Sequence, residues 1–236
     1  MGGTLFVVGT PIGNLEDVTA RAVRVLREVD VVACEDTRRT RALLSHFGIH
    51  TTTVSYYEYN KLVRGPQILR MLAEGRSVAL VTDAGTPGIS DPGFMLVRDA
   101  RAAGATVVPV PGPSAVATAL SAAGIPADRF LFDGFLPVKP GKRINRLRAL
   151  QALGTTIVLY ESPHRIVAAL EAIAEIFGPS DLVVARELTK QFEEIVTAPP
   201  AAHLERLRRG PIRGEFTLVL PAPRRTAKDD ETEGDD

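Results

Sequence analysis

The stretch 77–97 reads SVALVTDAGTPGISDPGFMLV. It begins with the apolar run 77–81, typical of a buried strand, and it ends in residues 94–97, which begin a helical pattern. The thirteen residues 81–93 hold three Gly, two Pro and two Asp. A strand-to-helix connection needs only about two to six residues. The excess of rigid and permissive backbone therefore indicates a binding loop.

Apolar runs alternate with helical patterns on both sides of this stretch. Strands are expected at 5–8, 31–34, 51–57, 77–81 and 106–110, with helices over 17–29, 40–47, 65–74, 94–103 and 113–123. Short β-branched runs between helices are typical of strands buried on both faces, as in a largely parallel sheet. After a linker at 124–128, strands are expected at 130–135, 155–160, 182–187, 192–197 and 215–220, and helices over 142–153, 163–177 and 201–209.

This order predicts two α/β domains, 1–123 and 124–223, followed by an acidic tail, 224–236, that is expected to be disordered. The helix over 163–177 is expected to begin with Ser162 as N-cap and Pro163 as its first residue.

The composition is that of a globular chain, with 45% hydrophobic residues. Its apolar runs are far shorter than the roughly 20 residues of a membrane span. With Cys34 as the only cysteine, the chain forms no internal disulfide and no Cys-based zinc site. We therefore expect a cytoplasmic protein without a membrane segment or metal. The net charge of zero conceals an acidic tail, because residues 1–225 hold 27 basic against 22 acidic residues.

Four expected strand ends continue into polar loops rich in Gly, Pro or charge, namely 9–15, 35–38, 81–93 and 109–114. Ligands of open parallel sheets bind beyond the carboxyl ends of the strands, so we expect these loops to line one crevice. One such loop alone is explained by a tight turn, but four favour a binding site. The loops match neither the dinucleotide fingerprint nor the P-loop. Their carboxylates, Asp36, Asp83 and Asp91, suit a cationic ligand such as S-adenosylmethionine.

Seven motifs follow one another in the order GTPIGNLEDVTARA, EDTR, DAGTPGISDPG, PGPSA, GFLP, YESPHR and RELTK. In these motifs the chain, from Thr4 to about Leu220, resembles the ribosomal RNA small subunit methyltransferase I family. This family forms 2'-O-methylcytidine in 16S rRNA and belongs to the tetrapyrrole methylase (class III) superfamily. The resemblance implies a homodimer of two-domain α/β chains of the tetrapyrrole methylase type, with S-adenosylmethionine in a cleft between the domains. The implied partner is 16S rRNA within the small ribosomal subunit.

The resemblance also implies which residues hold the cofactor, largely through backbone groups. They are Pro11, Gly13, Asp83, Ala84, Gly85, Thr86, Ser90, Asp91, Pro92, Gly93, Gly112, Pro113 and Ser114 in the first domain, and Tyr160, Ser162 and Glu215 in the second.

A ribose 2'-hydroxyl is a poor nucleophile at neutral pH, so a proton acceptor or an orienting group is expected. The candidates are Glu35, Asp36, Glu161, His164 and Lys190. Structural interpretations stand beside these roles. Glu35 and Asp36 lie next to Arg38, so ion pairing is expected to order the loop and to lower both pKa values. Lys190 is a solvated neighbour of an Arg–Glu pair. We favour Asp83 as an organiser of the cofactor loop.

Basic segments predict RNA contacts at Arg38, Arg39, Lys139, Lys142, Arg143 and Arg146, with Pro140-Gly141 as a mobile loop inside the second group. A third basic group is Arg206, Arg208, Arg209 and Arg213. Each group alone is equally typical of a solvated helix surface. Tyr56, Tyr57 and Tyr59 either stack a flipped or unpaired base or pack in the core or at an edge strand.

Two other functions stay open besides methylation of RNA. One is a class III methylase that acts on a small molecule such as a tetrapyrrole precursor. The other is a ribosome-assembly RNA-binding module without turnover. The EDTR and YESPHR motifs argue against the first alternative, and the intact cofactor loops argue against the second.

Overall fold

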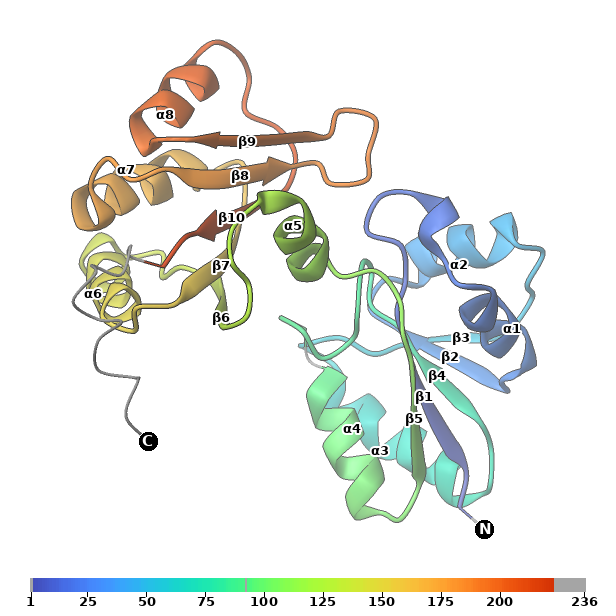
Figure 1. Cartoon of the computed structure of the whole chain (residues 1–236). Coiled ribbons are helices and arrows are strands. Elements are labelled where there is room, and N and C mark those ends of the chain that lie inside the picture. Colours follow the sequence, from blue (N-terminus) through green and yellow to red (C-terminus); the bar gives the residue numbers. More distant parts are fainter. Residues whose placement is uncertain (1, 92, 223–236) are drawn as a thin grey trace, which may run out of the picture. The chain divides into compact units, whose positions relative to one another are not determined.

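The computed structural model describes residues 2–91 and 93–222, and it confirms an α/β fold with two separate sheets (Figure 1). Contacts divide the chain into the units Met1–Ala115 and Val116–Asp236. The residues predicted as the acidic tail, 224–236, lie outside the described residues.

The division falls near the start of helix α5 (Ala115–Ala123), whereas the predicted boundary falls after it. Two contacts attach this segment to strand β7 (Thr156–Glu161). The Thr156 hydroxyl donates to the carbonyl oxygen of Pro126 at 2.9 Å. Tyr160 also forms a hydrogen bond with the backbone of Val116. The segment after residue 115 therefore folds with the second unit.

The first unit is a five-stranded parallel sheet in the order β3-β2-β4-β1-β5. Its strands are β1 (Thr4–Val8), β2 (Val31–Cys34), β3 (Thr53–Ser55), β4 (Val78–Leu80) and β5 (Thr106–Val110). Its helices are the 3-10 helix η1 (Leu15–Asp17) and the α-helices α1 (Ala20–Glu28), α2 (Thr37–His46), α3 (Lys61–Ala73) and α4 (Gly93–Ala102). The predicted parallel sheet is confirmed.

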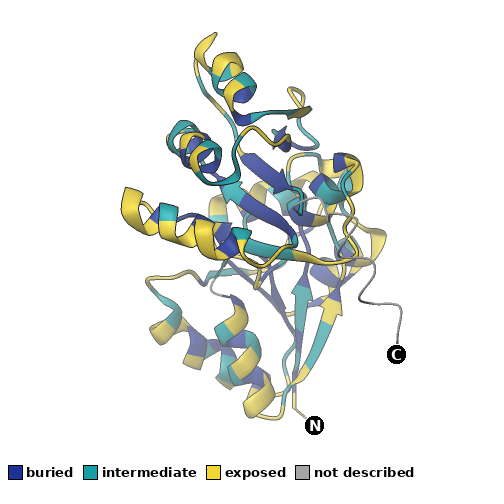
Figure 2. Cartoon of the chain, turned by 60° about the vertical axis from the view of Figure 1, so that its left-hand side comes forward, coloured by how far each residue is buried: buried dark blue, intermediate teal, exposed yellow. Residues whose placement is uncertain are grey.

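Side-chain alternation along the strands gives this sheet two hydrophobic cores. Val8 and Val32 pack with α1 and α2 on one face. Leu5 and Ala33 pack with α3 and α4 on the other face. Helices on both faces explain the continuous apolar strands, because neither face meets water. The central strands β2 and β4 are buried throughout, whereas β5 at the edge has exposed residues; the outer sides of the helices are yellow in Figure 2.

The second unit has a mixed sheet in the order β6-β7-β10-β8-β9, in which only β6 and β7 run parallel. Its remaining strands are β6 (Phe130–Phe135), β8 (Leu182–Arg186), β9 (Glu194–Ala198) and β10 (Phe216–Leu220), and its helices are α6 (Pro140–Gln151), α7 (Ile166–Phe177) and α8 (Pro200–Arg208). Leu147 of α6 and Leu170 of α7 are fully buried in one core with Leu159 and Leu218 of the sheet. The sequence predicted these strands but not their directions.

Two helix starts differ from the prediction. Pro140 and Gly141 form the first turn of α6 rather than a mobile loop, since a proline suits the first position of a helix. Helix α7 begins at Ile166, after a turn in which the amides of Arg165 and Ile166 both donate to Ser162. The predicted N-cap at Ser162 is therefore wrong. No helix within 2–91 and 93–222 is long and apolar enough to cross a membrane.

Candidate functional site

The loops after β1 and β5 touch at two glycines. A Cβ on Gly9 would lie 2.7 Å from the Cα of Gly112, and a Cβ on Gly112 would lie 2.8 Å from the Cα of Gly9. The Gly9 amide also donates to Val110 at 3.1 Å. Only residues without a side chain allow this approach, so the two loops meet backbone to backbone.

The loop after β4 is fastened to both of them. Thr10 and Gly85 exchange backbone hydrogen bonds of 2.9 and 3.1 Å, and the Thr10 hydroxyl donates to the carbonyl oxygen of Thr82 at 3.1 Å. The Thr86 hydroxyl donates to the Pro113 carbonyl oxygen at 3.2 Å. Three of the four predicted loops therefore form one connected edge. Sequence reasoning missed Thr10, although its place directly after the β1 glycine was visible.

Asp91 holds the second half of the loop between β4 and α4. Its two carboxylate oxygens accept the amides of Gly88 at 2.7 Å and Gly93 at 2.6 Å. Gly88 and Ser90 both have left-handed backbone, with φ of 88° and 61°. Burial raises the pKa of Asp91, and these amide hydrogen bonds partly offset the rise. The acid thus organises the turn, while Pro92 lies outside the described residues.

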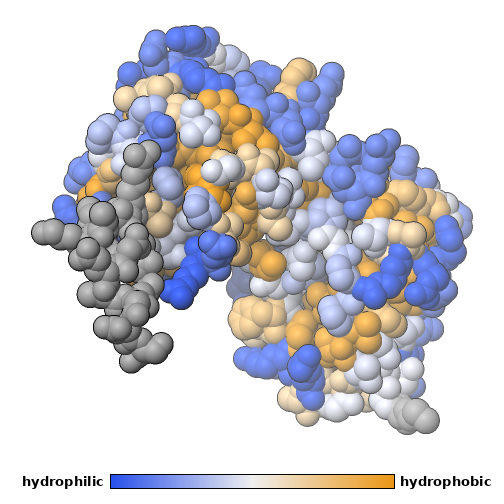
Figure 3. Space-filling view, viewed as in Figure 1, coloured by the Kyte–Doolittle hydropathy of each residue, from blue (hydrophilic) through white to orange (hydrophobic). Residues whose placement is uncertain are grey.

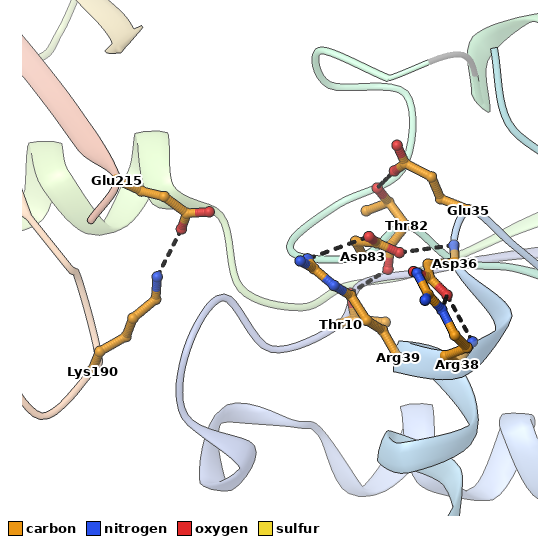
Figure 4. A network of polar contacts seen from close by, with 9 residues as sticks. All are labelled: Thr10, Glu35, Asp36, Arg38, Arg39, Thr82, Asp83, Lys190 and Glu215. Atoms are coloured by element: carbon orange, nitrogen blue, oxygen red, sulfur yellow. Dashed lines mark hydrogen bonds and ion pairs between the residues drawn. The ribbon is translucent and has the colours of Figure 1, made fainter. Parts of the chain in front are cut away.

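The loop after β2 joins the same edge through Asp83 (Figure 4). One Asp83 oxygen accepts the Asp36 amide at 3.0 Å, and the other lies 3.4 Å from Arg39. Asp36 in turn caps α2 by accepting the Arg38 amide at 2.8 Å, and it binds the Arg38 guanidinium at 3.2 and 2.7 Å. These hydrogen bonds from Arg38 hold the pKa of Asp36 far below its usual value. Asp36 therefore has a structural role at the start of α2.

Glu35 differs from its neighbour. It is exposed, and one oxygen accepts the Thr82 hydroxyl at 3.3 Å. Partial desolvation, followed by the charge of Asp83, raises the pKa of Glu35, so the predicted lowering of its pKa is wrong. Within the described part of the chain Glu35 forms no ion pair. A carboxylate with a raised pKa and a free approach is suited to accept a proton.

A cavity of about 310 Å³ lies at this edge. Its lining residues are Thr10, Pro11, Leu15, Arg39, Thr40, Ala42, Leu43, Thr82 and Asp83. Among them are Pro11 and Asp83, predicted for the cofactor, and Arg39, predicted for RNA. The remaining predicted residues of this unit, Gly13, Ala84 and Ser114, belong to the same loops.

In the second unit, Glu161 ends β7 and is only 2% exposed. It accepts the Ser162 amide at 2.8 Å and lies 3.4 Å from Arg165, which donates to the carbonyl oxygen of Leu136. Among residues 2–91 and 93–222, one Glu161 oxygen and the Nε atoms of Arg143 and Arg165 are buried without a hydrogen-bond partner. Burial raises the pKa of Glu161, against the Ser162 amide and the two guanidiniums. This position favours a role in fixing the turn rather than in proton transfer.

The basic start of α6 is less open than the sequence suggested. Arg143 is buried, contrary to its prediction as a surface RNA contact, and its charge acts to lower the pKa of Glu161. Arg146 is bound by Asp133, with one contact of 2.8 Å. Lys139 and Lys142 are exposed as expected.

Lys190 is held between two carboxylates. Its ammonium lies 2.8 Å from Glu187 and 2.9 Å from Glu215, and Figure 4 shows the second of these contacts. Partial burial lowers the pKa of Lys190, but these hydrogen bonds outweigh it and the net shift is upward. The lysine is therefore a cation and a hydrogen-bond donor, not a proton acceptor. Tyr160 packs edge to face on Phe132, with ring centroids 4.8 Å apart, and His164 is exposed on the turn before α7.

Comparison with known proteins agrees with this architecture. The profile of the family Tetrapyrrole (Corrin/Porphyrin) Methylases matches residues 4–203. Ribosomal RNA small subunit methyltransferase I of Pseudomonas aeruginosa is 53% identical over 200 residues, which are 84% of this chain and 71% of that protein. The protein of the same name from Escherichia coli O157:H7 is 48% identical over 92% of this chain and 77% of its own length.

Solved structures show the same fold at low sequence identity. Cobalt precorrin-4 methyltransferase, a cobalamin biosynthetic enzyme, aligns with a TM-score of 0.71 and 19% identity over 92% of this chain and 94% of its own. Uroporphyrin-III-C-methyltransferase from Thermus thermophilus aligns with a TM-score of 0.63 and 22% identity over 92% and 94%. The predicted tetrapyrrole methylase type of fold is confirmed.

Proposed function

Because the chain belongs to the ribosomal RNA small subunit methyltransferase I family, within the tetrapyrrole methylases, we propose that it methylates RNA of the small ribosomal subunit. The proposed donor is S-adenosylmethionine, and the proposed acceptor is the ribose 2'-hydroxyl of a cytidine in 16S rRNA. A substrate in the ribosome places the enzyme in the cytoplasm. The family resemblance also supports a homodimer, which light scattering of the purified chain would test.

The fastened loops of the first unit are the observation that carries this proposal. The Gly9–Gly112 approach leaves backbone, not side chains, to form the edge of the site. Asp83 lines the adjacent cavity with a carboxylate, which favours a cationic group. When bound, S-adenosylmethionine supplies an electrophilic methyl group on a positively charged sulfur. The residues that would hold it are those of the loops after β1, β4 and β5.

Among the predicted proton acceptors, Glu35 fits best. Asp36 is bound by Arg38, Lys190 is a cation, and Glu161 is almost completely buried. Glu35 is exposed, and its raised pKa makes its carboxylate a stronger base than an ordinary glutamate. We assign it the proton of the ribose hydroxyl, with His164 as the alternative.

Small ribosomal subunits from cells that lack this enzyme provide the test. Incubation with the full chain and methyl-labelled S-adenosylmethionine is expected to put label into 16S rRNA as alkali-resistant 2'-O-methylcytidine. Alkali resistance follows because a methylated 2'-oxygen cannot attack the neighbouring phosphate. Label in a base would contradict the ribose assignment. Label that enters a tetrapyrrole precursor, supplied in a parallel incubation, and not the subunits would contradict the RNA assignment.

A further inference from the structure

The second unit contains a basic cavity that is lined by none of the predicted catalytic or cofactor-binding residues. It has a volume of about 170 Å³ and lies among β8, β9, β10 and α8. Its lining residues are Val184, Arg186, Glu194, His203, Arg206, Leu207, Arg209 and Phe216. Three guanidiniums therefore surround one small space. Figure 3 shows hydrophilic residues in blue over α8.

Positive charge exceeds negative charge in this cavity. Glu194 is its one lining carboxylate, and it is shared by Arg186 at 3.6 Å and Arg206 at 3.4 Å. These distances are longer than those of a tight charge-assisted hydrogen bond, which are about 2.7–2.9 Å. Arg209 pairs outside the lining with the exposed Glu205 at 3.0 Å. The cavity thus presents guanidinium groups that Glu194 only partly neutralises.

Hydrogen bonds hold two of the side chains that line the cavity, Arg186 and His203. The Arg186 Nε donates to the Arg213 carbonyl oxygen at 2.8 Å, and its guanidinium carbon lies 5.8 Å from the centre of the Phe216 ring. The buried His203 ring forms a hydrogen bond with the Leu182 carbonyl oxygen at 3.2 Å. Arg186 is therefore held in place before any ligand arrives, which reduces the entropy lost on binding.

More cations continue beyond the cavity. Arg208 and Arg213 are exposed, and in the part of the chain that the structure describes neither side chain forms an ion pair. Exposed arginines close in the chain to a basic cavity are suited to contact an RNA backbone, because phosphates recur at every nucleotide.

We propose that this cavity binds a backbone phosphate of the substrate RNA and that Arg208 and Arg213 contact the adjacent phosphates. A cavity of about 170 Å³ accommodates a phosphate group with bridging water, given that one water occupies about 30 Å³. Guanidinium groups bind phosphate oxygens in a bidentate manner. The identity of the ligand as small-subunit RNA rests on the proposed function. The surface supplies affinity and orientation without sequence information.

The test measures binding of the full chain to small ribosomal subunits between about 50 and 200 mM salt, the range over which phosphate contacts are most visible. The double variant Arg206→Gln/Arg209→Gln is expected to weaken binding about tenfold and to reduce the slope of log Kd against log salt by about 1, the loss of one phosphate contact. Glu194→Gln is expected to have the opposite effect, because it removes the carboxylate that competes with phosphate for Arg186 and Arg206.

The matched control is Arg24→Gln/Arg27→Gln on α1, which removes two exposed arginines from the first unit. It is expected to leave binding unchanged. An Arg206→Gln/Arg209→Gln variant with the wild-type salt slope, or a control that weakens binding equally, overturns the proposal, as does a wild-type chain that does not bind the subunits. If the arginine variant does not fold in a thermal melt, Glu194→Gln decides alone. Wild-type binding with the expected slope but without methyl transfer would contradict the proposed function and not the cavity.

Discussion

Glu35 and Asp36 are neighbours in the chain, yet the structure shifts their pKa values in opposite directions. Asp36 accepts hydrogen bonds from the backbone and the guanidinium of Arg38, which stabilise its anion. Glu35 is partly desolvated and lies near the charge of Asp83, and both effects disfavour its anion. The sequence shows two adjacent acids beside arginines. It does not show which acid the guanidinium binds, because that depends on the α2 cap.

This difference predicts the effect of Glu35→Gln. The variant is expected to lower the rate of methyl transfer by about 10²–10⁴-fold, the usual contribution of a general base, with cofactor affinity unchanged. The wild-type rate is expected to fall as the pH drops through the pKa of Glu35, at a pH above the ordinary 4.5, because protonation removes the acceptor. Single-turnover rates across pH would measure both. A pH limb that persists in Glu35→Gln and disappears in His164→Ala would transfer the role to the histidine.

At the level of elements, periodicity predicted every strand of both sheets, but not how the second sheet pairs. In the first unit, helices between successive strands require crossovers and so a parallel sheet. In the second unit, β8 and β9 are joined by a short loop without a helix, and β10 inserts between β7 and β8. That insertion is a matter of tertiary packing, and local residue patterns do not encode it.

The contact between the β1 and β5 loops leads to a prediction about Gly112→Ala. Its Cβ would meet the Gly9 backbone at 2.8 Å, so the loops must separate. We expect a loss of unfolding free energy of about 1–3 kcal/mol, as for other overpacked sites, together with weaker binding of S-adenosylmethionine. Urea denaturation and calorimetry would measure the two effects.

Gly141→Ala is the matched control for that variant. It lies in α6 with no atom within 4 Å of the new Cβ, so the same substitution is expected to stabilise the helix by about 0.5–1 kcal/mol. A Gly112→Ala chain that is as stable as the wild type and binds the cofactor equally well would show that the close approach does not shape the site.

At the scale of the whole molecule, the motifs proved easier to find than the roles of their residues. The motifs GFLP and YESPHR are separated in the sequence by helix α6 and strand β7, and the structure joins them where Arg165 donates to the Leu136 carbonyl oxygen. Residue type alone suggested that Glu161 was a base and that Arg143 met RNA. Both side chains are buried, which argues against these roles, and burial depends on which elements pack together.

The charge of the whole chain gives a last prediction. Residues 226–236 hold six acids and one lysine, so removing them takes the formal net charge from zero to a surplus of five positive charges. Association with a polyanion is steered by net charge, and salt screens this steering over about 8–10 Å near 0.10–0.15 M ionic strength.

The chain 1–225 is therefore expected to bind small ribosomal subunits with a faster association rate than the full chain at low salt, and with an equal rate at high salt. Stopped-flow measurements at several ionic strengths would show this convergence. Equal association rates at low salt would mean that the 226–236 charges do not act on the encounter, and a rate difference that survives high salt would point to a direct contact instead of long-range charge.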